Sequence, residues 1–187
     1  MYYRINRLLY EEPEFVPIRL EDVTDTDVLW GHGEFCADPI LTPLKAVLST
    51  KGGNVMPDFD VGRLPLVSNR LAEILRKAGV DNLQLFDTEI TDPLTGVVYS
   101  DYKAMNLIRA VSCANLDASE YEPSKAPRID FTKLVIDESR ARGLCMFRLA
   151  ESLKYILISQ KVRDVLIRMP LIGVRISALD DPDTYVG

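Results

Sequence analysis

The sequence has few of the residues that catalytic and metal-binding sites use most. Among 187 residues there are one histidine and three cysteines. Cys36, Cys113 and Cys145 are widely separated and no pair has CxxC spacing, so the sequence predicts reduced structural thiols and not a zinc site. We therefore expect neither a metal nor a cofactor in this protein.

The single histidine allows one catalytic hypothesis. His32 is flanked by glycines and followed by Glu34 and Cys36. A histidine beside a thiol or carboxylate can activate a nucleophile when a third group orients it, so a small hydrolase or transferase is one interpretation. We favour a loop histidine, because spacing along the chain does not show that these side chains meet, and we predict no catalytic residues.

Two further signals of chemistry are weak. The Gly52-Gly53 pair lacks the spacing and the lysine of a phosphate-binding loop. Asp58 and Asp60 could flank a glycosidic bond, but carboxylates two residues apart in a segment rich in proline and glycine more often form turns. The sequence therefore favours a protein that is not an enzyme.

Long apolar runs are also absent. No stretch approaches the roughly 20 apolar residues of a membrane span, and residues 1–7 lack the apolar region of a signal peptide. We therefore expect a cytoplasmic protein that does not bind membranes.

Acidic residues outnumber basic residues by 28 to 22, which gives a formal net charge of −6. This balance argues against nucleic-acid binding, which depends on neutralising phosphates, and suits a basic protein partner. The acidic residues gather in two segments, and a tyrosine lies beside the second: Glu21, Asp22, Asp25 and Asp27, then Asp180, Asp181, Asp183 and Tyr185. We expect these residues to contact the partner; a solvated acidic surface is the alternative.

The most informative positive feature is a repeat. Residues 66–75 and 157–166 align 91 positions apart. Each copy contains a serine, Ser68 or Ser159, that can cap a helix, and an apolar stripe with helical spacing follows it. In the second copy this stripe runs to Met169. Internal duplication is one explanation, and two unrelated capped helices followed by strands are the other.

The ends of the two helices and the strands after them are also predicted. Gly79 and Pro170 should end the helices, the first by permitting a left-handed cap and the second by lacking an amide donor. Residues 83–86 and 174–177 then alternate apolar and polar side chains, as half-buried strands do.

Strands are predicted for much of the remaining chain. Residues 2–9 form an opening strand, and residues 80–90 and 97–112 form a hairpin, because the loop between them has good turn chemistry. Residues 129–137 and 144–149 are expected to make a second pair.

These patterns predict an α+β fold in which a mainly antiparallel sheet is covered by two similar serine-capped helices, each followed by a short strand. Residues 1–54 should supply an N-terminal strand and an irregular segment rich in glycine, proline and aspartate, packed on the body, and the excursion of little regular structure should run from residue 31 to residue 62. Residues 55–179 form the α+β domain, and residues 180–187 form an acidic C-terminal tail.

Several segments resemble one family. Residues 56–59, 65–68 and 79–86 are similar to a bacterial immunity-protein domain that was first described in myxobacteria and long catalogued as a domain of unknown function. Later segments follow the family's order: Tyr102 with residues 106–108, Leu116-Asp117 with Ser119, residues 134–138, and residues 146–151 ahead of Ile158-Ser159. The resemblance spans roughly residues 55–177 and departs from the family pattern at residues 170–172, where the family has an Ala-Gly-Leu type of helix ending.

The resemblance implies a non-catalytic antidote that binds and neutralises a cognate antibacterial toxin or effector, encoded beside it and linked to a secretion system such as type VI. An acidic surface would steer a basic toxin into encounter. Besides the small hydrolase or transferase, an adaptor of a secretion machine is the other interpretation. Self-association through exposed strand edges stays open.

Overall fold

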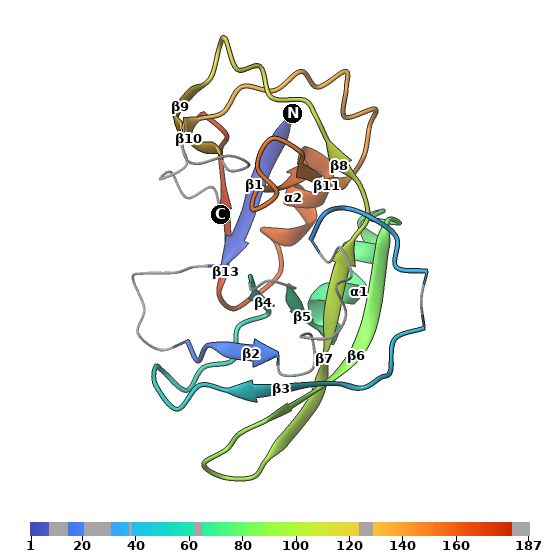
Figure 1. Ribbon diagram of the computed structural model, residues 1–187, viewed down its shortest axis with the longest axis vertical. Coiled ribbons are helices and arrows are strands. Elements are labelled where there is room, and N and C mark those ends of the chain that lie inside the picture. Colours follow the sequence, from blue (N-terminus) through green and yellow to red (C-terminus); the bar gives the residue numbers. More distant parts are fainter. Residues whose placement is uncertain (8–14, 21–30, 38, 62–64, 124–128, 181–187) are drawn as a thin grey trace.

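A computed structural model describes residues 1–7, 15–20, 31–37, 39–61, 65–123 and 129–180 (Figure 1). Among these described residues, 42% lie in strands and 10% in two short helices. The strands of the described part form three sheets. Neither of the helices in that part has the length and apolar character needed to cross a membrane.

Two large sheets carry most of the strands. The six-stranded sheet has the order β2 (Ile18–Leu20), β3 (Leu44–Leu48), β6 (Leu83–Thr91), β7 (Val98–Leu107), β5 (Leu66–Ser68) and β4 (Phe59–Asp60). The five-stranded sheet has the order β13 (Val174–Ser177), β1 (Tyr2–Arg7), β12 (Ile156–Ser159), β11 (Met146–Leu149) and β8 (Ala110–Val111). The small sheet pairs β9 (Glu120–Pro123) with β10 (Ile129–Lys133), and the helices are α1 (Asn69–Lys77) and α2 (Gln160–Leu166).

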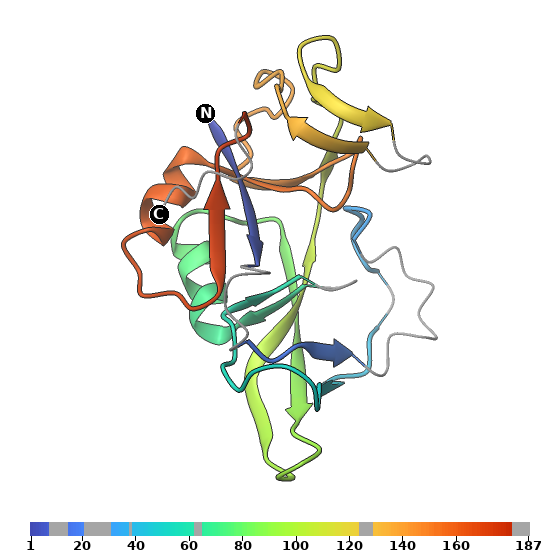
Figure 2. The ribbon, with the colours of Figure 1, turned by 90° about the vertical axis from the view of Figure 1, so that its left-hand side faces the viewer.

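The predicted α+β fold, one sheet covered by two helices, is wrong, because the protein is mostly β and has three sheets. Each helix spans only about two turns at 3.6 residues per turn, so it covers little of a sheet. The two helices lie side by side and contact each other (Figure 2). They bury Leu71, Leu75, Val162 and Leu166 in one core to which both large sheets contribute. Separate clusters of apolar side chains bury the other faces of the two sheets.

Both predicted helix caps are confirmed. The Ser68 hydroxyl oxygen accepts a hydrogen bond from the Leu71 amide at 3.1 Å. The Ser159 hydroxyl oxygen accepts one from the Val162 amide at 3.5 Å. Each bond satisfies one amide of the first helical turn that has no partner within the helix.

The two helices end differently. The first stops at Gly79 as predicted, and this glycine has a φ of +97°, the left-handed conformation that a glycine adopts without strain. The second ends at Leu166, well before Pro170. Met169, which we predicted to continue the apolar stripe, is therefore 41% exposed.

Several strand predictions are confirmed and others are wrong. The opening strand corresponds to β1, and the predicted hairpin corresponds to β6 and β7. The second predicted pair does not form, since β10 pairs with β9 and β11 pairs with β12 and β8. Strands β3 and β4 lie within residues 31–62, where we expected little regular structure.

The sequence repeat corresponds to a larger structural repeat. We define the first unit as β4, β5, α1, β6 and β7, and the second unit as β1, β11, β12, α2 and β13. Their strands have the orders β4-β5-β7-β6 and β11-β12-β1-β13, and every neighbouring pair is antiparallel. Ser68 lies opposite Tyr102 in the first unit, and Ser159 lies opposite Tyr2 in the second. The repeated unit therefore consists of four strands and a helix. The chain order of the units differs, because β7 directly follows β6 whereas its equivalent, β1, precedes the rest of its unit.

Specific hydrogen bonds recur in the two units. In each, the capping serine donates its amide to a carbonyl and a tyrosine hydroxyl donates to the carbonyl one residue earlier. The donors and acceptors are Ser68 N to Asp58 O and Tyr102 Oη to Pro57 O in the first unit, and Ser159 N to Cys145 O and Tyr2 Oη to Leu144 O in the second, all at 2.9 Å.

Ionisation of the buried Tyr102 hydroxyl should lower the free energy of unfolding at alkaline pH. Burial, and then the nearby Asp101 carboxylate, raise the pKa of Tyr102 above its ordinary value of 10.0. The phenol therefore ionises first in the unfolded chain. The resulting stabilisation is complete below the unfolded pKa and is lost as the pH rises through the folded pKa. Between about pH 9 and about pH 11, the free energy of unfolding should fall more for the wild type than for Tyr102→Phe, by at most about 1.4 kcal/mol per pH unit. Urea unfolding at both pH values tests this, and equal falls would contradict it.

Candidate functional site

The His32 loop does not bring its candidate residues into one environment. His32 and Glu34 are exposed, whereas Cys36 is buried. The Cys36 amide donates to Gln84 Oε1 at 2.7 Å, and Gln84 Nε2 donates to the Cys36 carbonyl at 2.9 Å. These bonds fix the backbone of the loop against β6. In the described part of the chain, no group of three or more histidine, cysteine or acidic side chains could hold a metal ion.

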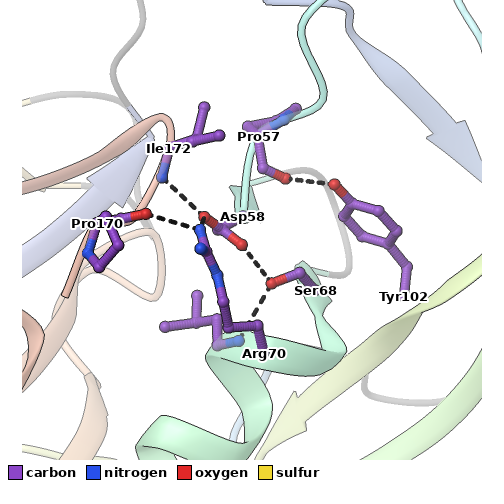
Figure 3. A network of polar contacts seen from close by, with 8 residues as sticks. Pro57, Asp58, Ser68, Arg70, Tyr102, Pro170 and Ile172 are labelled. Carbon is purple, nitrogen blue, oxygen red and sulfur yellow. Dashed lines mark hydrogen bonds and ion pairs between the residues drawn. The ribbon is translucent and has the colours of Figure 1, made fainter.

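Asp58 is a structural residue and not a turn former. Its carboxylate is buried and accepts hydrogen bonds from Ser68 Oγ, from Arg70 Nη2 and from the Ile172 amide (Figure 3). Arg70 also donates to the Pro170 carbonyl at 2.8 Å. Ser68 caps the start of α1, and Ile172 follows the end of α2. This one carboxylate therefore joins the start of the first helix to the loop after the second.

Asp60, in β4, closes the six-stranded sheet. One carboxylate oxygen accepts from Arg7 Nη1 at 2.7 Å, and the other accepts from the Ile18 amide at 3.1 Å. Ile18 begins β2, at the opposite edge of the same sheet from β4. The contact draws the two edges together, and the sheet curls into a half-barrel. Both carboxylates that could have flanked a sugar are thus buried and bonded to protein donors.

Arg148 is a deeply buried cation in β11. It is 5% exposed, and its Nη1 donates to the Leu153 carbonyl at 2.8 Å, while Nε and Nη2 have no hydrogen-bond partner among the described residues. Burial lowers the pKa of Arg148 to about 10. The guanidinium therefore stays charged at neutral pH and cannot serve as a general base. No pattern in the sequence predicted this burial.

The acidic residues that we predicted to bind a partner are mostly outside the described part. Asp180 is described and exposed. The other predicted residues lie outside the described ranges: Glu21, Asp22, Asp25, Asp27, Asp181, Asp183 and Tyr185. Their role stays a prediction.

A surface that sequence reasoning missed lies at the far end of the β6–β7 hairpin. Strands β6 and β7 have 9 and 10 residues, whereas their equivalents β13 and β1 have 4 and 6. The repeat therefore accounts for residues 83–86 and 102–107 only. We call residues 87–101 the hairpin end, and its loop projects beyond the rest of the described molecule (Figure 1).

Apolar side chains are exposed on the hairpin end. Leu94 is 76%, Val97 47% and Val98 52% exposed. Val98 lies opposite Thr91, which lies opposite Val47 of β3, so these three residues form one row across the sheet. The neighbouring residues Ala46, Leu48 and Ile90 are buried on the other face. The row therefore faces away from the core.

A pocket adjoins this row. It has a volume of about 490 Å³, and its apolar lining comes from three segments: Pro17 and Ile18, Val47 and Leu48, and Pro93 of the hairpin loop. Ser49, Thr50 and Arg19 also line it. The hairpin end and the pocket therefore form a continuous surface that combines a protrusion with a recess.

The loop of the hairpin end is held by its own hydrogen bonds. The Asp92 carboxylate accepts from the Leu94 amide at 2.9 Å and from Thr95 Oγ1 at 2.6 Å. The bond from the Thr95 side chain is the main reason that the pKa of Asp92 lies below its ordinary value. Gly96 has a φ of +73° and donates its amide to the Asp92 carbonyl at 2.8 Å. The loop thus has a defined shape that presents Leu94 to solvent.

The hairpin end is also acidic. Residues 87–101 contain four carboxylates and no lysine or arginine: Asp87, Glu89, Asp92 and Asp101. Lys103 pairs with Asp87, and Lys45 pairs with Glu89. Within the described ranges no cation pairs with Asp92 or Asp101. The surface therefore carries unneutralised negative charge beside its apolar side chains.

No model of a known protein family matches the chain, and no curated protein matches it. The resemblance to the immunity-protein domain consequently rests on its motifs alone.

The two capping serines provide a matched test of the Asp58 network. Ser159→Ala removes only a cap and should lower the free energy of unfolding by about 1 kcal/mol. Ser68→Ala removes a cap and also a donor to the buried Asp58, which should cost about 1–3 kcal/mol more. Urea unfolding at neutral pH measures both losses. Equal losses would show that the bond from Ser68 to Asp58 does not contribute.

Proposed function

We propose that this protein is a non-catalytic immunity protein that binds and neutralises a cognate antibacterial toxin or effector, encoded next to it and linked to a secretion system. The observation that carries the proposal is the hairpin end, an exposed apolar and acidic surface that the repeated fold does not require. Singly exposed apolar residues are normal on a protein, but a group beside a pocket is typical of interaction sites. The motifs shared with the immunity-protein domain support the same function.

Inhibition by binding needs a stable scaffold and a complementary surface. The shared core and the buried carboxylates of Asp58 and Asp60 provide the scaffold. A stable complex should bury about 1,200–2,000 Å² in total and depend on a few anchor residues. The excess of acidic residues would speed encounter with a basic toxin more than it would raise the final affinity.

The proposal is tested by co-expression with the product of the neighbouring gene in a toxin-sensitive host, followed by co-purification. We expect growth to be rescued and a stable complex to be recovered, because the antidote occupies the toxin. A complex without rescue would indicate a secretion adaptor instead. If growth is not rescued and no complex is recovered, the proposal is refuted.

The acidic C-terminal segment gives a second prediction of the same function. Reversing the charges of Asp180, Asp181 and Asp183 to lysine should weaken binding to a basic toxin, mainly by slowing association at low salt. Association rates measured at two salt concentrations test this. Unchanged rates would refute a contribution of this segment to toxin binding.

A further inference from the structure

We infer that the hairpin end and the pocket beside it form the surface that contacts the toxin, and that the toxin presents there an apolar projection bordered by lysine or arginine. This inference rests on the proposed function and adds to it the location of the interface and the chemistry of the partner.

The repeat provides the first argument. The shared core needs only residues 83–86 and 102–107 of the hairpin, because their equivalents in β13 and β1 suffice in the second unit. The hairpin end is therefore an addition to the repeated unit. Its Ile90 is buried and its Tyr99 packs in the apolar cluster on the other face of the six-stranded sheet, so the addition is anchored to the fold.

Exposure provides the second argument. Leu94 is the most exposed large apolar side chain of the hairpin end, at 76%, and Val97 and Val98 stand near it. Pro93 belongs both to this loop and to the wall of the pocket. A partner that covers Leu94 would meet the pocket as well, and its apolar projection could fill a recess of about 490 Å³. The combination of a projecting side chain and a neighbouring recess suits an anchor-and-pocket interface.

Charge identifies the kind of partner. Asp92 and Asp101 have no cation partner in the described part of the chain. Lysine or arginine around the partner's apolar projection would complement these carboxylates. An acidic or neutral partner would leave them uncompensated.

The hydrogen bonds within the loop make the surface ready for binding. The contacts of Asp92 with Leu94, Thr95 and Gly96 fix the loop before any partner arrives. A surface that is already ordered loses less conformational entropy on binding.

The test uses the full chain and the product of the neighbouring gene, with affinities measured by calorimetry. The double substitution Leu94→Gln/Val97→Thr removes apolar contact without changing charge. Both side chains are exposed, so the fold should be unaffected, which thermal unfolding checks. We expect affinity to fall about 30-fold or more, as loss of an interface anchor does.

Met169→Gln is the matched control. Met169 is also an exposed apolar side chain, at 41%, but it follows α2. The Met169→Gln variant should bind with an affinity within about twofold of the wild type, because it changes a surface residue outside the interface. If the wild type binds and the double variant binds equally well, the interface inference is overturned while the proposed function stands. If the wild type does not bind, both fail.

A second pair of variants tests the charge of the partner. Asp101→Asn should slow association at low salt, and the difference should shrink at high salt because ions screen exposed charges. Asp117→Asn, an exposed carboxylate in the turn before β9, should change neither rate. Association by Asp101→Asn that is as fast as wild type, or faster, would refute a basic partner.

Discussion

The arrangement of the two large sheets depends on two buried carboxylates that flank Phe59 in and beside β4. Asp58 holds the start of α1 to the loop after α2. Asp60, at one edge of the six-stranded sheet, bonds to Arg7 of β1 and to Ile18 at the other edge. Each is paired with an arginine and each also accepts a backbone amide, so neither charge is left without donors. The side chains of Arg7 and Asp60 are only 11% and 7% exposed, and removing one partner of a buried ion pair costs about 3–5 kcal/mol. A two-residue strand therefore determines how the units meet.

The parts of the fold that sequence reasoning predicted depend on local chemistry. The caps at Ser68 and Ser159 need only the next helical turn, and the left-handed end at Gly79 needs only that residue. The β6–β7 hairpin follows from the turn residues between its strands. The spacing of the repeat was visible because serine and the apolar stripe recur at the same positions.

What the sequence did not predict depends on contacts between distant segments. Asp58 and Asp60 look like turn residues until Arg70 and Arg7 are placed beside them. The hairpin was predicted, but its exposed row exists because β3 lies parallel to β6 and turns Val47 outward. The two helices were expected to cover one sheet, yet their short stripes are buried in a core that both sheets share.

The place of β1 in the chain has a consequence for how the protein is made. The first unit is complete within residues 59–107, so its strands can pair while later residues are still being synthesised. The second unit places Tyr2 opposite Ser159 and Arg7 opposite Val174, so β1 has to wait for almost the whole described chain. Contacts between residues so far apart slow folding. On the ribosome, the first unit would assemble early, and β1 would remain a strand without its neighbours until translation has passed β13.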